Sequence, residues 1–262
     1  MMLKRFMDEA YGEKGRSRRL ETRRGDRIFG LEDLADRVGQ RPSRASVEEL
    51  MPENDPLLAQ MVATNPGKKY AMIWGILSSI AAERSPSPLR LAPRDYAGLE
   101  LCAGTIILEE VGDRAVDHVG ERMRGGRIFV RCRAGDYLGQ EMLGGGIVSK
   151  GCGNFAFRNM HGGRVAVLGD AGSCIGLGNS GGRIAVRGNC KERAGWLMHA
   201  GSLRVRKDAG DYLGLLMSGG SIRVMGKAGR RAGWRMKGGC IEAGAFGEEA
   251  GDKCRTHSLT GQ

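Results

Sequence analysis

The chain of 262 residues has no closely spaced cysteines, no long apolar run and few aromatic side chains. Its seven cysteines are an odd number and form no CxxC pair, which argues against a disulfide framework and against a zinc or iron–sulfur cage. The longest apolar stretch, residues 71–82, is shorter than the roughly 18–20 residues that a membrane-spanning helix needs. The first residues are charged and lack the apolar core of a secretory signal. We therefore expect a cytoplasmic protein with buried free thiols and no membrane partner.

Metal-binding histidine patterns are also absent from the sequence. Neither HxH nor HExxH occurs, and the four histidines are His118, His161, His199 and His257. We expect each histidine to lie at a surface corner, and we expect no metal site and no active site built by this chain alone.

Glycine and positive charge, by contrast, are in excess. The chain has 44 glycines, well above the usual share of about 7%. Its formal net charge is +11, so its surface should attract anions such as acidic protein, an anionic substrate or nucleic acid.

The glycines recur in pairs with a period of nineteen residues. The second glycine of each pair stands at 126, 145, 163, 182, 201, 220 and 239, so the steps are 19, 18, 19, 19, 19 and 19. Three residues earlier the chain has Met123, Met142, Met160, Asn179, Met198, Met217 and Met236. Two residues later it has Ile128, Ile147, Val165, Ile184, Leu203, Ile222 and Ile241. A third glycine precedes each methionine position by three residues, except where Phe157 replaces it.

This repeat predicts an all-β fold, a right-handed parallel β-helix of about seven coils. Aliphatic residues alternate with polar ones, which is strand periodicity, and glycine corners flank each strand. A 19-residue unit cannot bury its apolar face alone, so successive units must stack. We expect the methionine and aliphatic positions to form the core and the glycines to form tight corners. We place the solenoid at residues 91–254, followed by a tail at 255–262.

Residues 1–90 show no trace of the repeat and are predicted to be mainly helical and irregular. Helical spacing occurs at 31–39, 46–51, 55–64 and 68–84, and a stiff SPSP segment follows at 85–88. We expect this extension to act either as an arm that docks on a partner or as a cap on the first coil.

The repeat units resemble a known family. Residues 134–148 (AGDYLGQEMLGGGIV), 209–229 (AGDYLGLLMSGGSIRVMGKAG) and 228–244 (AGRRAGWRMKGGCIEAG) resemble the GXGXG repeats found in one subunit of formylmethanofuran dehydrogenase and of the related formyltransferase/hydrolase complex. The resemblance covers about residues 100–253, and the same repeat type occurs in the C-terminal domain of the glutamate synthase large subunit. Residues 1–90 match nothing in these families.

The resemblance implies a scaffold subunit rather than a catalytic one. In a formyl-transfer complex such a subunit would bridge an amidohydrolase-like and a formyltransferase-like subunit. The complex would use a methanofuran-type carrier with a carboxylate-rich tail, with no cofactor bound by this chain alone. The alternative is a GXGXG subunit of a glutamate synthase-like amidotransferase with an FMN-binding partner.

Basic residues occupy the outward positions of the predicted strands. The first, third and fifth residues of each strand should face outward, since the second and fourth are the core positions. These outward positions contain Lys150, one acid, Glu242, and eight arginines. The arginines are Arg127, Arg131, Arg164, Arg183, Arg187, Arg204, Arg206 and Arg223. We expect this face to bind an anionic partner or carrier, unless acids at the preceding corners neutralise it; those acids are Asp117, Asp136, Glu192 and Asp211.

Aromatic residues bear on two remaining questions: whether nucleic acid is the partner, and where a partner subunit could dock. A nucleic-acid-binding solenoid is our third hypothesis. Single-stranded nucleic acid usually needs aromatic stacking platforms, and the face offers only Phe129, so we do not expect nucleic acid as the partner. Binding of a duplex through its phosphates alone stays open. Trp196 and Trp234 occupy equivalent repeat positions, and the sequence leaves open whether they lie in the core or form a strip for a partner subunit.

Overall fold

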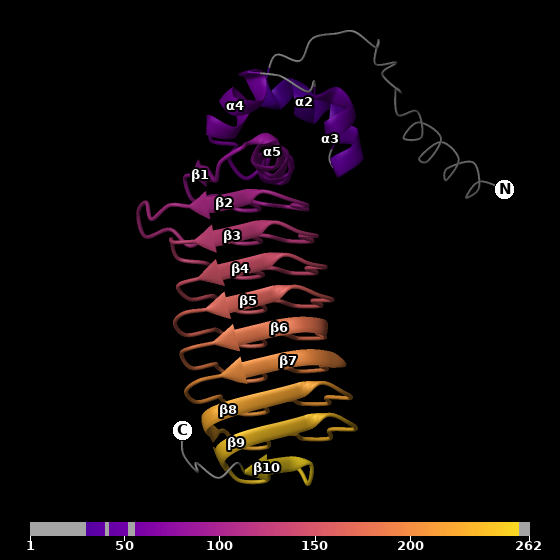
Figure 1. Ribbon diagram of the computed structural model, residues 1–262, viewed down its shortest axis with the longest axis vertical. Helices are drawn as coiled ribbons and strands as arrows, with labels where there is room; N and C mark the ends of the chain where they lie inside the picture. The colour runs from indigo at the N-terminus through magenta and orange to yellow at the C-terminus, as the bar shows by residue number, and fades with distance from the viewer. Residues whose placement is uncertain (1–29, 40–41, 52–55, 257–262) are drawn as a thin grey trace, which may run out of the picture.

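The protein is a right-handed parallel β-helix with a small group of helices at its N-terminal end (Figure 1). The computed structural model describes residues 30–39, 42–51 and 56–256. The basic segment 1–29 and the tail residues 257–262, which include His257, lie outside the described residues. In the part of the chain that is described, no helix is both long and apolar enough to cross a membrane.

One sheet of ten strands runs the length of the solenoid, and each strand pairs in parallel with the next in sequence. The strands are β1 (Leu89–Leu91), β2 (Thr105–Leu108), β3 (Arg127–Val130), β4 (Gly146–Ser149), β5 (Arg164–Val167), β6 (Ser180–Val186), β7 (Ala200–Val205), β8 (Ser221–Ala228), β9 (Cys240–Phe246) and β10 (Cys254–Thr256). A second line of contact between coils is made by short parallel bridges, such as Ala171 with Cys190.

The seven coils of the 19-residue period correspond to β3–β9, and the column continues beyond them at both ends. The coil of β2 has Leu101 at the methionine position and Gly104 at the second-glycine position. From Gly104 to Gly126 the step is 22 residues, because extra residues follow β2. At the other end Cys254 of β10 pairs with Ile241, only 13 residues earlier. These changed spacings hide the flanking strands from a search at a fixed period.

The predicted core positions are buried. Five of the six repeat methionines are fully buried, and Met236 of the last repeat is partly buried against the same core. Gly220 shows why the corners need glycine. Its φ is +85°, and a Cβ there would lie 2.8 Å from the Met198 Cε and 2.9 Å from the carbonyl oxygen of Gly201. Such a contact is closer than van der Waals packing allows, so a side chain would separate the coils.

The seven cysteines are free, as expected, and three of them are fully buried: Cys132, Cys174 and Cys190. Burial raises the pKa of Cys152 to about 12, which keeps that thiol protonated and unreactive at neutral pH. Cys102 is exposed and therefore departs from the expected burial.

Asn179 interrupts the methionine ladder, the column of core positions that holds a methionine in the other six coils of the repeat. Its side chain is fully buried, and its Oδ1 accepts a hydrogen bond from the Gly181 N–H at 3.0 Å. Its Nδ2 has no hydrogen-bond partner among the described residues. A buried donor without a partner costs on the order of 1–3 kcal/mol.

Replacing Asn179 by methionine should therefore raise the free energy of unfolding by about 1–2 kcal/mol. The substitution removes the unpaired donor and restores the residue type of the ladder, at the expense of one hydrogen bond. Urea denaturation, with an unchanged slope against denaturant, would measure the gain. The converse substitution Met217→Asn is the control and should lower the midpoint. A lower midpoint for Asn179→Met would contradict this account.

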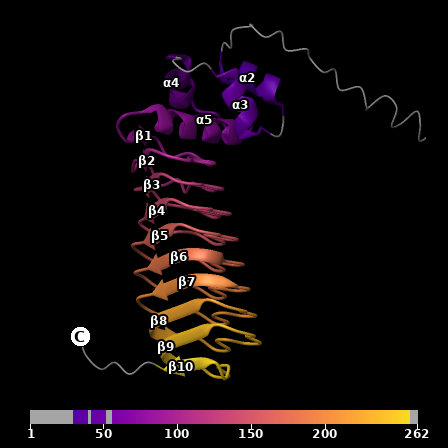
Figure 2. The same cartoon turned by 45° about the vertical axis from the view of Figure 1, so that its right-hand side comes forward.

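Among the described residues, four helices lie at the N-terminal end: α2 (Leu31–Val38), α3 (Arg44–Leu50), α4 (Pro56–Ala63) and α5 (Ala71–Arg84). Helix α5 runs across the end of the strand column, with the other three helices beyond it (Figure 2). The hydroxyl of Ser79 donates to the carbonyl oxygen of Leu99 at 2.8 Å, and the Gly98 N–H donates to the hydroxyl of Ser78 at 3.0 Å. The helix thus satisfies backbone groups that the first coil would otherwise leave unpaired.

Arg44 connects α3, α5 and the first coil. Its Nη2 lies 2.5 Å from Glu83 Oε2, and its Nη1 donates to the carbonyl oxygen of Glu100 at 2.8 Å. Glu83 also accepts from the Cys102 N–H at 2.8 Å. Burial alone would raise the pKa of Glu83, but the guanidinium and this N–H outweigh burial and lower the pKa. Glu83 is therefore held in its charged form, as the ion pair requires.

Candidate anion-binding face

The strands place three rows of side chains on the outer face of the sheet, as the alternation predicted. Row 1 is the residue directly before the aliphatic core residue of each strand (Ile128 in β3), row 2 the residue directly after it, and row 3 the residue three positions after it. From β3 to β7, row 1 is Arg127, Gly146, Arg164, Arg183 and Ser202. Over the same strands, row 2 is Phe129, Val148, Ala166, Ala185 and Arg204. Row 3 is Arg131, Lys150, Leu168, Arg187 and Arg206.

Two of the eight predicted arginines are neutralised by ion pairs. Arg131 lies 3.3 Å from Glu109, and Arg223 lies 2.5 Å from Glu242. Lys150 is also paired, at 2.5 Å from Glu110. The two glutamates at 109 and 110 follow β2, the strand that the 19-residue period does not reveal. The sequence analysis therefore overestimated the positive charge of this face at its β2–β4 end.

The other six arginines are exposed and have no ion pair with any acid in the described residues. Five of them, which we call the arginine cluster, gather on β5–β7: Arg164, Arg183, Arg187, Arg204 and Arg206. Arg164 and Arg183 are register partners on adjacent strands. Adjacent strands are about 4.8 Å apart, which is within the Debye length of about 8 Å at physiological salt, so these charges repel one another and would be stabilised by an anion.

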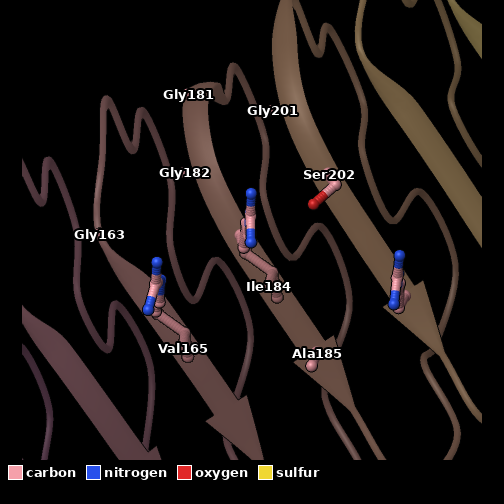
Figure 3. Close-up of a pocket in the computed structure, with 11 residues that line it drawn as sticks. Gly163, Val165, Gly181, Gly182, Ile184, Ala185, Gly201 and Ser202 are labelled. Atoms are coloured by element: carbon pink, nitrogen blue, oxygen red, sulfur yellow. The ribbon is translucent and has the colours of Figure 1, made fainter.

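A shallow groove follows row 1 along the sheet. Over β5–β7 it has a volume of about 860 Å³ and is lined by Arg164, Arg183 and Arg204. Figure 3 shows this part, with Gly163, Gly182 and Gly201 near the strand starts. Over β3–β5 a second hollow of about 680 Å³ is lined by arginines and by the apolar residues of row 2. The two hollows share Arg164, so we treat them as one feature, the sheet groove.

The acids at the corners bind groups of neighbouring corners rather than the arginines of the sheet face. Asp117 Oδ1 accepts from the Asp136 N–H at 2.8 Å, and Asp136 Oδ1 accepts from the Asn154 N–H at 2.7 Å. Asp211 accepts from the backbone N–H and the side chain of Arg230, which hold the pKa of that carboxyl below its usual value. Glu192 accepts from the hydroxyl of Ser173 at 2.9 Å. In the described residues, none of these four acids forms an ion pair with an outward arginine, whereas Glu109 and Glu110 do neutralise bases of the face.

The two predicted interface tryptophans are half-buried, at positions outside the fully buried core. The Trp196 Nε1 is buried without a hydrogen-bond partner among the described residues. The guanidinium of Arg231 lies over the Trp234 ring at 5.1 Å from its centroid. Leu215, also half-buried, stands between them at the same repeat position. The structure thus makes them part of an apolar strip along the coil corners, and a subunit interface there stays a prediction.

The histidines form contacts that sequence reasoning missed. The Nδ1 of His161 lies 2.7 Å from the Ser180 hydroxyl, and the Nδ1 of His199 lies 2.7 Å from the Ser218 hydroxyl. Residues 178–182 read GNSGG and match the G-x-S-x-G pattern of serine hydrolases. However, Ser180 begins a strand, with no helix after it, and the second pair occurs without the motif. The contacts therefore follow from the repeat.

His118 lies inside a stack of aromatic rings. Its ring is 4.6 Å from that of Tyr96 and 4.8 Å from that of Tyr137, and Phe155 continues the stack at 5.4 Å. Its Nδ1 lies 2.6 Å from Glu121 Oε2. The four rings occupy one repeat position, five residues before the methionine position of each coil. Comparing the residues at this position across the repeats would have predicted the stack from the sequence. Over the described ranges, no three His, Cys, Asp or Glu side chains are arranged to hold a metal ion.

Comparisons with known proteins do not assign the chain to a family. No protein-family model matches the sequence, and no curated protein matches it significantly. The sheet groove, the arginine cluster and the repeat therefore provide the basis for a function.

Proposed function

We propose that the chain is a non-catalytic scaffold subunit of a multi-subunit formyl-transfer complex of the formylmethanofuran dehydrogenase or formyltransferase/hydrolase type. In this role it bridges an amidohydrolase-like and a formyltransferase-like subunit. The observation that carries the proposal is the arginine cluster, five exposed guanidiniums without acidic partners in the described chain, set on a repeat that resembles the GXGXG repeat of these complexes.

The cluster gives the scaffold a binding chemistry. Guanidinium groups pair well with carboxylates, so the face fits an acidic surface of a neighbouring subunit or the carboxylate-rich tail of a formyl carrier. The groove beside the cluster is open along the sheet, which allows an extended partner to contact several coils.

The shape also suits a bridging role. Ten stacked strands extend over about 45 Å, long enough to contact two partners at separate places. The arginine cluster lies on the sheet face, whereas the strip with Trp196 and Trp234 lies on the coil corners. Two different surfaces are therefore available for two subunits.

Isolation of the native complex tests the proposal. The chain, tagged and expressed at its natural level, should co-purify with an amidohydrolase-like and a formyltransferase-like subunit in stoichiometric amounts, as measured by mass spectrometry. Recovery of an FMN-binding synthase instead would support the glutamate synthase-like alternative. Salt-sensitive binding of duplex DNA by the purified chain would support the nucleic-acid alternative. Recovery of the chain without any partner would overturn the scaffold role.

A further inference from the structure

The sheet groove changes in character along its length. Row 2 is apolar from β2 to β6, where it consists of Ile107, Phe129, Val148, Ala166 and Ala185. At β7 the same row becomes Arg204. Over β3–β6 the groove thus has an apolar floor along row 2, bordered by the arginines of row 1. On the other side of row 2, the bases of row 3 that follow β3 and β4 are already paired with acids.

Gly146 opens a notch in this groove that the fold does not require. Its φ is not positive, and a Cβ built on it would come no closer than 3.6 Å to another residue's atoms, the carbonyl oxygen of Arg164. A side chain would therefore fit without strain. Each other strand from β2 to β9 has a side chain at this row 1 position. Glycine within a strand often marks a place where a ligand or another backbone approaches closely.

The spacing of the three rows matches the width of an α-helix. Rows 1 and 3 are four residues apart along a strand, which corresponds to about 13 Å. A helix with its side chains is about 10–12 Å across. Residues three or four apart on one helix face are about 5–6 Å from each other, close to the strand spacing of about 4.8 Å. Three strand spacings, from β3 to β6, give about 14 Å, the length of roughly 10 helical residues.

We propose that the sheet groove binds an amphipathic acidic helix of a partner subunit, laid along the solenoid axis. Its apolar stripe contacts row 2 and approaches most closely at Gly146, and its acidic flank faces the unpaired arginines of row 1. This inference rests on the proposed function and names the kind of partner that the arginine face takes.

An anionic chain without apolar groups fits the groove less well. Such a chain would pair with the arginines but would leave Phe129, Val148 and the 44% exposed side chain of Leu168 in contact with water. Removing apolar area from water is favourable, so the floor favours a ligand with an apolar side. Recognition of an apolar stripe at helical spacing is a common mode of peptide binding.

Three labelled peptides serve as probes for the full-length chain. The first is a 16-residue peptide of leucine and glutamate with leucines at helical spacing; the second is its scramble, without an apolar stripe; the third is deca-glutamate. Fluorescence anisotropy at low salt measures each dissociation constant, and circular dichroism reports helix formation. We expect the amphipathic peptide to bind at least tenfold tighter than either control and to become helical when bound.

Gly146→Trp fills the notch and should weaken binding of the amphipathic peptide at least tenfold, with little effect on deca-glutamate. Ser221→Trp is the matched control, because it adds the same side chain in row 1 at β8, beyond the apolar floor. Val148→Ser is a second variant, which removes apolar floor without adding bulk, and it should also weaken the amphipathic peptide selectively. Thermal unfolding of each variant identifies those that fold.

The outcomes separate this inference from the proposed function. The helix proposal is overturned if the scramble or deca-glutamate binds as tightly as the amphipathic peptide. It is also overturned if Gly146→Trp and Val148→Ser fold and still bind the amphipathic peptide more tightly than the two controls. In both cases anion binding by the face stands. If none of the three peptides binds at low salt, both the helix and the anionic role of the face fail.

Discussion

Replacing Phe157 by glycine should destabilise the solenoid, although it restores the residue that the other six repeats have at this position. Phe157 is fully buried, and removing a buried phenylalanine ring costs about 3–5 kcal/mol. Its φ is +59°, and glycine would relieve about 1 kcal/mol of that strain. The free energy of unfolding should therefore fall by about 2–4 kcal/mol.

The neighbouring coils show why the ring is needed here. In the regular coils the tip of an isoleucine covers the glycine; a Cβ on Gly214 would lie 2.4 Å from the Ile241 Cδ1. In the coil of Phe157 the strand residue is Val165, which is shorter. The phenylalanine ring fills the space and extends towards Gly139, whose built Cβ would lie 2.9 Å from the Phe157 Cδ1. Without the ring a cavity remains between the coils.

Denaturant unfolding of the full chain measures this effect. Phe155→Gly is the matched control, because Phe155 is also an aromatic residue with positive φ, at +55°, but it is half-buried in the outer stack. It should cost less than Phe157→Gly. Adding Val165→Ile to the Phe157→Gly variant should recover about 1 kcal/mol, since the extra methylene group refills part of the cavity. Equal or higher stability for Phe157→Gly would show that the ring is not a packing element.

Much of the fold was predictable because a solenoid repeats the same short structural unit in each coil. The spacing of Met217, Gly220 and Ile222 recurs in each coil and predicts a core, a corner and a strand together. What the period could not reveal were the coils with altered spacing. Gly104 lies 22 residues before Gly126, so the coil of β2, with Glu109 after its strand, fell outside the pattern.

The candidate site was predictable in its positions but not in its charge. Alternation along a strand placed Arg183 and Arg204 outward, and both are exposed. Which arginines are paired depends on side chains from another coil, as with Arg131 and Glu109. The role of the corner acids was hidden for a similar reason, because a sequence does not tell whether Asp136 accepts from a backbone N–H or from a guanidinium.

Removal of four arginines from the cluster should abolish most of the affinity of the face for anions. The variant combines Arg183→Ser, Arg187→Ser, Arg204→Ser and Arg206→Ser. An exposed ion pair contributes about 0.5–1 kcal/mol, so four lost contacts amount to about 2–4 kcal/mol. At low salt the dissociation constant for deca-glutamate should rise by about 30- to 1000-fold, since each 1.4 kcal/mol is tenfold.

Salt and a charge-matched control separate the cluster from the net charge of the chain. Near 1 M salt the Debye length is about 3 Å, so the difference between the variant and the unmodified chain should shrink to a few-fold. The control replaces four exposed bases outside the strands by serine: Arg124, Arg158, Arg235 and Lys237. Its formal net charge falls by the same four units, from +11 to +7. Because long-range attraction depends on net charge, whereas contact pairing depends on position, the control should lose less than tenfold in affinity. If it loses as much as the cluster variant, the chain attracts anions through overall charge and the sheet face has no special role in binding them.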